Sequence, residues 1–272
     1  MKKLILSTLV VFLSLLTAAQ AGETFDRVLK DRVLRCAYTI YPPFFAKDPN
    51  TGTFSGIFHD VLEAMGKELS IDIQWTEEVG MDAILQGLQS GRYDAVCPGY
   101  FVTPSRANGG DFTKSPVYVP TYIYVRDSES RFNTFKDVNA EGVKMGTMDG
   151  EYSDILQHQR FPKTEAVSLM GLSSAAERFE LVATGKADFT VAEATVALEY
   201  MAHNPDKIKA FGPPIIMGAS TIIVPHDEYP LVAYLNAAID SLLLSGELDV
   251  ILDKHQKHEG EFLLPAKPYE VK

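Results

Sequence analysis

The chain has 272 residues, of which 25 are Lys or Arg and 36 are Asp or Glu, so its formal net charge is −11 at pH 7. This acidic balance, with no basic run to offset it, argues against binding to nucleic acid or to an anionic membrane. A hydrophobic fraction of 46% is ordinary for a globular protein. The length suits one large domain or two lobes of about 100–150 residues each.

Residues 1–21 have the pattern of a secretory signal peptide. Lys2 and Lys3 form a charged end, residues 4–16 form an apolar run too short to span a bilayer, and residues 19–21 form an A-x-A cleavage site. Loss of the two lysines leaves 23 basic against 36 acidic residues, a net charge of −13. We therefore expect an exported, soluble mature protein, which in a bacterium resides in the periplasm.

Strands and helices alternate along the rest of the chain. Period-two and continuous apolar runs predict strands at 33–38, 71–75, 94–97, 117–125, 143–145, 166–169, 189–192 and 222–224. Helical periodicity predicts helices at 56–69, 81–90, 152–160, 174–184 and 230–245. This succession predicts an α/β fold in which mostly parallel sheets are covered by helices.

The two cysteines, Cys36 and Cys97, lie in strands that would be neighbours in such a sheet. A disulfide and a pair of buried free thiols are equally consistent with this placement. Motifs for metal or phosphate binding, such as CxxC, HExxH or a Gly-rich loop, do not occur. His255 and His258 fit a solvated helix end better than a metal site. We therefore expect no metal and no cofactor.

One pattern occurs twice, 94 residues apart. Gly91, a basic residue and Asp94 lead from a helix into an apolar strand, and Gly185, a basic residue and Asp188 do the same. The repeat suits two similar α/β lobes. Five residues after each Asp come Gly99 and Glu193, at the carboxyl ends of their strands, where open α/β sheets bind ligands.

The segment 93–112 indicates an anion site. Thr103-Pro104 is a good helix start, and it places Arg106 in the first turn. Free N–H groups beside a guanidinium bind carboxylate or phosphate. On this segment alone, a solvated Arg on an ordinary helix is equally consistent.

Seven motifs in order give a resemblance to a known family, the periplasmic solute-binding proteins of polar amino-acid ABC importers (bacterial extracellular solute-binding family 3). They are Leu34 to Tyr38 with Tyr41-Pro-Pro-Phe44, Thr53 to Asp60, Leu88 to Asp94, Thr103 to Arg106 with Asp111-Phe-Thr113, Gly146-Thr147, Gly185 to Glu193, and Ser245 to Lys254. The resemblance covers nearly the whole mature chain. It implies the type II periplasmic-binding-protein fold, with two lobes that close on a ligand through two hinge crossings.

The resemblance also implies residue roles. Tyr41 matches an aromatic residue that stacks on the ligand, and Arg106 matches the Arg that holds its α-carboxylate. Thr147 resembles part of the second-lobe cradle for the same carboxylate. Glu193 stands where the family usually has an Asp that receives the ligand's ammonium. Without the resemblance, Glu193 fits a solvated loop residue and Tyr41 fits an aromatic packed on its two prolines.

Departures from the family pattern bear on the ligand. Tyr38 stands where many relatives have Asp, while Phe101 and Met148 each replace a residue that normally donates a hydroxyl. Together with Tyr41 and Met81, these side chains favour a ligand with apolar or aromatic surface. Glu193 is one methylene longer than Asp, so the space for an ammonium group changes.

The expected function is therefore the periplasmic substrate-binding component of an ABC importer, a monomer that binds an amino acid or small organic acid and delivers it to an inner-membrane permease. The expected lobes are residues 22–121 with 218–272, and residues 122–217. Two alternatives remain. The fold also hosts cyclohexadienyl dehydratases, in which Glu193 could be a general acid. The protein could also present its ligand to a separate membrane sensor.

Overall fold

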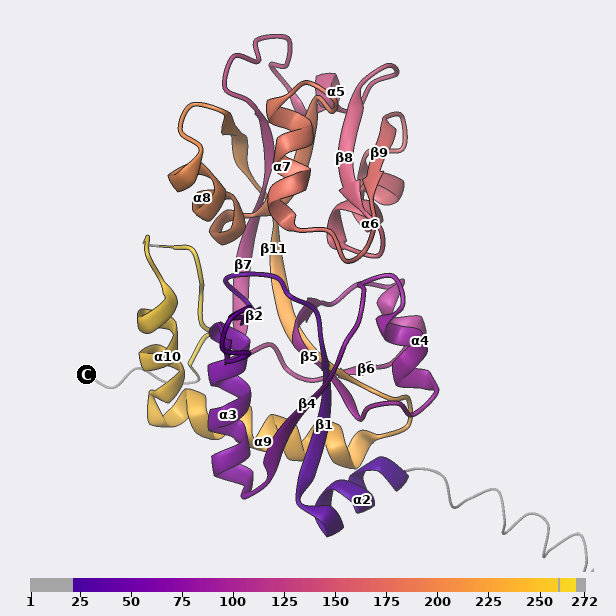
Figure 1. Cartoon of the computed structure of the whole chain (residues 1–272), viewed down its shortest axis with the longest axis vertical. Coiled ribbons are helices and arrows are strands. Elements are labelled where there is room, and N and C mark those ends of the chain that lie inside the picture. The colour runs from indigo at the N-terminus through magenta and orange to yellow at the C-terminus, as the bar shows by residue number, and fades with distance from the viewer. Residues whose placement is uncertain (1–21, 259, 268–272) are drawn as a thin grey trace, which may run out of the picture.

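The computed structural model describes residues 22–258 and 260–267, and it divides visibly into two halves joined by two long strands (Figure 1). The expected signal peptide, residues 1–21, lies outside the described residues. Among the helices of the described part, none has the length and apolarity needed to cross a bilayer.

The first half contains both ends of the described chain. Its helices pack around a group of mainly parallel strands in the lower part of Figure 1. Its elements are α2 (Glu23–Asp31), β1 (Val33–Tyr38), β2 (Ala46–Lys47), β3 (Phe54–Ser55), α3 (Ile57–Leu69), β4 (Asp72–Glu78), α4 (Ile84–Gln89), β5 (Ala95–Phe101), the 3₁₀ helix η1 (Arg106–Asn108), β6 (Asp111–Phe112), α9 (Tyr229–Ser245) and α10 (Glu247–His255).

The second half is formed by one continuous stretch of chain between the two joining strands. The joining strands are β7 (Val117–Arg126) and β11 (Ile208–Val224). Between them lie α5 (Phe135–Val138), β8 (Lys144–Met148), α6 (Tyr152–Arg160), β9 (Glu165–Leu169), α7 (Ala175–Ala183), β10 (Phe189–Glu193) and α8 (Ala194–His203).

Hydrogen bonding runs unbroken through both halves, in the strand order β4-β1-β5-β11-β7-β10-β8-β9, with β6 beside β11. The outer pairs are parallel, whereas β7 and β11 are antiparallel to each of their neighbours. The predicted α/β class with mostly parallel strands is confirmed. The predicted strand 222–224 is far too short, because it is only the end of a strand that begins at Ile208.

The two joining strands pair with each other in two separate stretches. Ile208 to Phe211 face Arg126 to Ile123, and Ile216 to Ser220 face Thr121 to Val117. The register shifts between Phe211 and Ile216, where Gly-Pro-Pro interrupts β11. Proline has no N–H to donate, so the hydrogen bonding between β11 and β7 is interrupted at these residues.

The helix predicted to begin at Thr103-Pro104 is only a short 3₁₀ turn. Only the three-residue η1 forms, because Gly109 and Gly110 end it and β6 then joins β11. The predicted cap itself is present, since the Thr103 hydroxyl accepts a hydrogen bond from the Arg106 N–H at 3.2 Å. The anion-site argument therefore depends on the guanidinium and not on a helix dipole.

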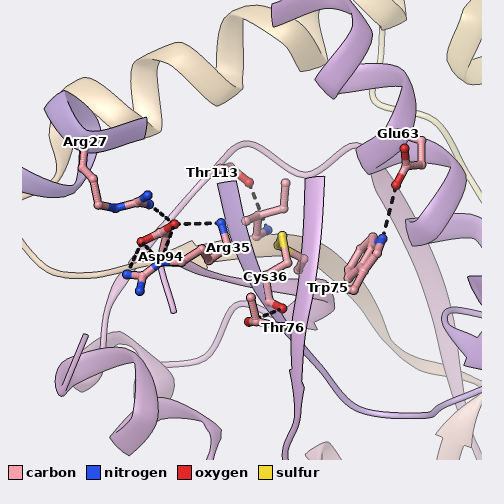
Figure 2. Close-up of a disulfide and its surroundings, with 10 residues drawn as sticks. Arg27, Arg35, Cys36, Glu63, Trp75, Thr76, Asp94 and Thr113 are labelled. Carbon is pink, nitrogen blue, oxygen red and sulfur yellow. Dashed lines mark hydrogen bonds and ion pairs between the residues drawn. A yellow bond between two sulfur atoms is a disulfide. The ribbon is translucent and has the colours of Figure 1, made fainter. Parts of the chain in front are cut away.

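Cys36 and Cys97 form a disulfide that joins β1 to β5 (Figure 2). Of the two alternatives open from the sequence, the bridge is the one found. Cys36 and Cys97 are fully buried in a hydrophobic core cluster that extends from the first half into the second. Beside the bridge, the indole of Trp75 on β4 donates to Glu63 on α3, at 3.2 Å.

The repeated Gly–basic–Asp pattern has the same structure in both halves. Gly91 and Gly185 have φ angles of 71° and 78°, which favour glycine because a Cβ is disfavoured there. Asp94 accepts the backbone N–H of Arg35 at 2.7 Å, and Asp188 accepts the backbone N–H of Lys144 at 2.8 Å. Each Asp thus ties the start of its strand to the neighbouring parallel strand, which explains why the sequence repeats.

Candidate ligand-binding site

A cavity lies between the two halves, at the carboxyl ends of the strands. It is lined from the first half by Thr39, Tyr41, Phe44, Met81, Pro98, Gly99, Tyr100, Phe101 and Arg106, and from the second half by Glu151, Tyr152 and Glu193. Gly99 and Glu193, which share one position in the repeated pattern, both belong to the lining. The expectation that both lie at one rim is confirmed.

Gly99 is required by close packing. Its φ is 85°, and a Cβ at this position would lie 2.2 Å from the ring of Phe58. The glycine lets β5 approach α3 closely while the next residues, Tyr100 and Phe101, turn toward the cavity. The ring of Phe101 contacts that of Tyr152 edge to face, with centroids 5.0 Å apart, across the two halves.

Arg106 is a buried cation at the wall of this cavity, with 6% of its surface exposed. Its guanidinium donates to the carbonyl oxygens of Phe101 at 3.0 Å and Gly150 at 3.1 Å, and it lies 4.9 Å from the ring centroid of Tyr100. Burial lowers the pKa of Arg106 below its usual value. Within the described residues, no carboxylate forms a salt bridge with it.

Tyr41 connects the first half to buried charges of the second. Its hydroxyl donates to Glu193 at 3.0 Å and accepts from the Arg178 guanidinium at 3.2 Å. Arg178, fully buried on α7, also pairs with Glu151 and donates to the Ser153 hydroxyl at 3.0 Å. One chain of hydrogen bonds thus runs from Ser153 and Glu151 through Arg178 and Tyr41 to Glu193.

Glu193 ends β10 and precedes α8, where it is 5% exposed. Burial, and then the charge of nearby Glu151, raise the pKa of Glu193 to about 7, against the lowering effects of Arg178 and the Tyr41 hydrogen bond. A carboxyl group in this position exchanges a proton near neutral pH. The lining thus holds one cation, Arg106, and two carboxyl groups, of which Glu193 can be neutral or negative near pH 7.

The two halves also meet through main-chain groups at the edge of the cavity. The N–H of Met81 donates to the carbonyl of Gly171 at 3.2 Å. A Cβ on Gly150 would lie 2.5 Å from the backbone nitrogen of Asp82, so the glycine permits this approach. The described conformation is therefore one in which the halves are closed on each other.

The structure brings together six of the nine residues predicted for the site: Tyr41, Met81, Gly99, Phe101, Arg106 and Glu193. The other three lie outside the lining. Tyr38 packs against Phe45, Phe54 and Trp75, with ring centroids 5.2, 5.0 and 6.5 Å away. Thr147 and Met148 are fully buried within β8.

The strand β8 is longer than expected, and this explains why Thr147 and Met148 do not line the cavity. It continues to Met148, so Asp149 and Gly150 form the turn, and Glu151 and Tyr152 come to the cavity instead of Thr147. Glu151 caps α6 by accepting the Ser153 N–H at 2.7 Å. An acidic residue at the start of a helix, which the helix dipole favours, was the available signal for Glu151.

Three comparisons with known proteins agree with this geometry. The family model of the bacterial extracellular solute-binding proteins, family 3, matches residues 34–258. The L-arginine-binding protein of Pseudomonas aeruginosa is 26% identical over 227 residues, covering 79% of this chain and 84% of that protein. The ABC transporter arginine-binding protein 1 of Escherichia coli is 25% identical over 260 residues, covering 93% and 98%.

The solved structures include a similar crystal structure, that of the ancestral amino acid-binding protein AncCDT-1, described as a precursor of cyclohexadienyl dehydratase. It has a TM-score of 0.75 and 25% identity, and the match covers 86% of this chain and 100% of that one. The expected type II periplasmic-binding-protein fold is thereby confirmed. Since the family model spans most of the chain, the protein belongs to the bacterial extracellular solute-binding proteins, family 3.

Proposed function

We propose that this protein is the periplasmic substrate-binding component of an ABC importer and that it binds an amino acid or a related small organic acid. Family membership and relatives named as amino-acid ABC transporter-binding proteins support this assignment. In this proposal residues 1–21 direct export, and the mature monomer presents its ligand to a permease of the inner membrane.

The observation that carries the proposal is the buried guanidinium of Arg106 at the cavity wall, which forms no salt bridge within the described residues. A buried cation without a carboxylate partner is costly, and a ligand carboxylate in the cavity offsets that cost through charge-assisted hydrogen bonds. Glu193, on the opposite half, supplies the complementary group for an ammonium. A ligand with both charges therefore contacts both halves.

Contact with both halves is also what favours closure, because a ligand shifts a conformational equilibrium only by binding one state better than the other. We assign residues 22–121 and 218–272 to the first lobe and residues 122–217 to the second. The hinge then lies at the paired strands β7 and β11, beside the interrupted register of β11.

A thermal-shift screen of amino and organic acids tests the assignment, because a ligand that binds only the folded protein raises its stability. We expect at least one carboxylate-bearing compound to stabilise the protein. Calorimetry with that compound should show that Arg106→Ala weakens binding by about 2–5 kcal/mol, while Arg160→Ala, at an exposed arginine, does not. Unchanged affinity in Arg106→Ala would refute the carboxylate role.

A second candidate function is that of a cyclohexadienyl dehydratase-like enzyme. The pKa of Glu193 near 7, in a cavity otherwise rich in aromatic side chains, favours a general acid. AncCDT-1, one of the similar structures, is described as a precursor of such an enzyme. Incubation with a cyclohexadienyl carboxylic acid, followed by ultraviolet absorbance of the aromatic product, separates the two functions, and Glu193→Gln should abolish any turnover.

A further inference from the structure

We propose that Arg178 sets the side-chain specificity of the cavity. By pairing with Glu151 it neutralises the second carboxylate of the lining, so the site selects α-amino acids with uncharged side chains and discriminates against cationic ones. This inference rests on the proposed amino-acid binding. It concerns a residue that lies behind the cavity wall and acts through Glu151.

The charges around the cavity lead to this conclusion. The lining contains one cation, Arg106, and two acidic residues, Glu151 and Glu193. Arg106 and Glu193 match the carboxylate and ammonium that every α-amino acid carries. Glu151 is therefore the carboxylate that could recognise a cationic side chain, unless another group already neutralises it.

The structure shows that Glu151 is already neutralised. One of its oxygens, Oε2, accepts the backbone N–H of Ser153 at 2.7 Å, the hydroxyl of Ser153 and the guanidinium of Arg178. Glu151 is 3% exposed and Arg178 is fully buried. Although burial opposes it, the charge of Glu151 raises the pKa of Arg178 above its usual value, so Arg178 stays a cation beside Glu151. Because the guanidinium of Arg178 already balances the charge of Glu151, the pair offers a ligand cation little net attraction.

The remaining lining provides no other charged group for a ligand side chain. It consists of aromatic, aliphatic and hydroxyl groups from Thr39, Phe44, Met81, Pro98, Tyr100, Phe101 and Tyr152. The Thr39 hydroxyl is itself engaged, with the carbonyl of Val79 at 2.6 Å and the hydroxyl of Tyr100 at 2.9 Å. This surface suits an apolar side chain, whereas a desolvated cation would lack a partner.

Arg178 has a second effect through Tyr41. Its Nη2 donates to the Tyr41 hydroxyl, which in turn donates to Glu193. The arginine thereby orients the aromatic ring that the first half places in the cavity. Loss of Arg178 therefore leaves Glu151 as an unpaired buried carboxylate and releases Tyr41, and the first of these changes should attract a cationic side chain.

The test uses calorimetry with two probes, L-methionine with an uncharged side chain and L-arginine with a cationic one. The wild-type protein should bind L-methionine more tightly. In Arg178→Met, the affinity for L-arginine relative to that for L-methionine should rise by about tenfold or more. Arg178→Lys keeps the charge, and Arg178→Met combined with Glu151→Gln removes both charges, so both variants should stay close to the wild-type ratio.

A reciprocal variant keeps the proposal falsifiable if Arg178→Met does not fold. Glu151→Gln leaves Arg178 unpaired, so it should improve binding of L-glutamate relative to L-glutamine by about tenfold. Tighter wild-type binding of L-arginine than of L-methionine would overturn the inference, as would unchanged ratios in the folded single variants. If no amino acid binds the wild-type protein at all, the proposed function itself fails, which is a different result from unchanged ratios.

Discussion

Glu193→Gln should stabilise the unliganded protein at alkaline pH and leave its stability nearly unchanged under acidic conditions. Burial and Glu151 raise the pKa of Glu193 from 4.5 to about 7. Between these values the folded protein binds more protons than the unfolded chain, so the free energy of unfolding falls as pH rises. Once the pH exceeds the pKa of Glu193 in the folded protein, the free energy of unfolding has fallen by about 3 kcal/mol in total. Glutamine has no charge to desolvate, and it can still accept the hydrogen bond from Tyr41.

Urea unfolding at about pH 4 and about pH 8 measures this difference directly. The stability of Glu193→Gln relative to wild type should rise by about 3 kcal/mol between the two conditions. Glu165→Gln, at an exposed position on β9, is the matched control and should show no such change. If both variants follow the wild-type pH dependence, Glu193 ionises as freely in the folded protein as in the unfolded chain, and the reasoning is refuted.

Three other outcomes are expected. Replacement of Cys36 and Cys97 by Ala should lower the free energy of unfolding in urea by about 4 kcal/mol, because the disulfide closes a long loop, and an unchanged midpoint would contradict this. Asp94→Asn should lower the free energy of unfolding by about 1–3 kcal/mol in the same assay, because the buried carboxylate accepts hydrogen bonds from the backbone N–H and the guanidinium of Arg35. Equal stability would show that the repeated motif is dispensable. With a stabilising amino acid from the screen, X-ray scattering should show a smaller radius of gyration, and Glu193→Ala should reduce that compaction; full compaction in this variant would remove Glu193 as the second-lobe contact.

The sequence predicted the fold class and the elements with strong periodicity. The helix at 152–160 has the predicted bounds, and Gly99 and Glu193 were correctly placed at one rim by the internal repeat. These successes depend on local signals, namely helical periodicity and glycine-terminated helices. The length of β11 was missed because Gly-Pro-Pro breaks its pattern, and its pairing with β7 is decided by tertiary contacts.

The cavity was only partly predictable for a physical reason. Tyr38 was expected in the lining, but its ring packs outside the cavity against Phe45, Phe54 and Trp75. Arg178 shares the buried face of α7 with Ala175, Phe179 and Val182, but an arginine by residue type alone predicts a solvated side chain. Its role depends on Glu151, which is 27 residues away, and single-sequence patterns do not report such pairs.

The course of the chain through the joined sheet has a consequence for the order of folding. The second half is one uninterrupted stretch between β7 and β11, so it can fold as soon as that stretch has emerged into the compartment where the protein folds. The first half cannot complete its fold until the C-terminal part of the chain is present, because β5 pairs with the end of β11 and α3 packs against α9 near the C-terminus. Cys36 and Cys97 both precede β7, so once the chain reaches an oxidising compartment their bond can hold β1 and β5 together until the last helices arrive.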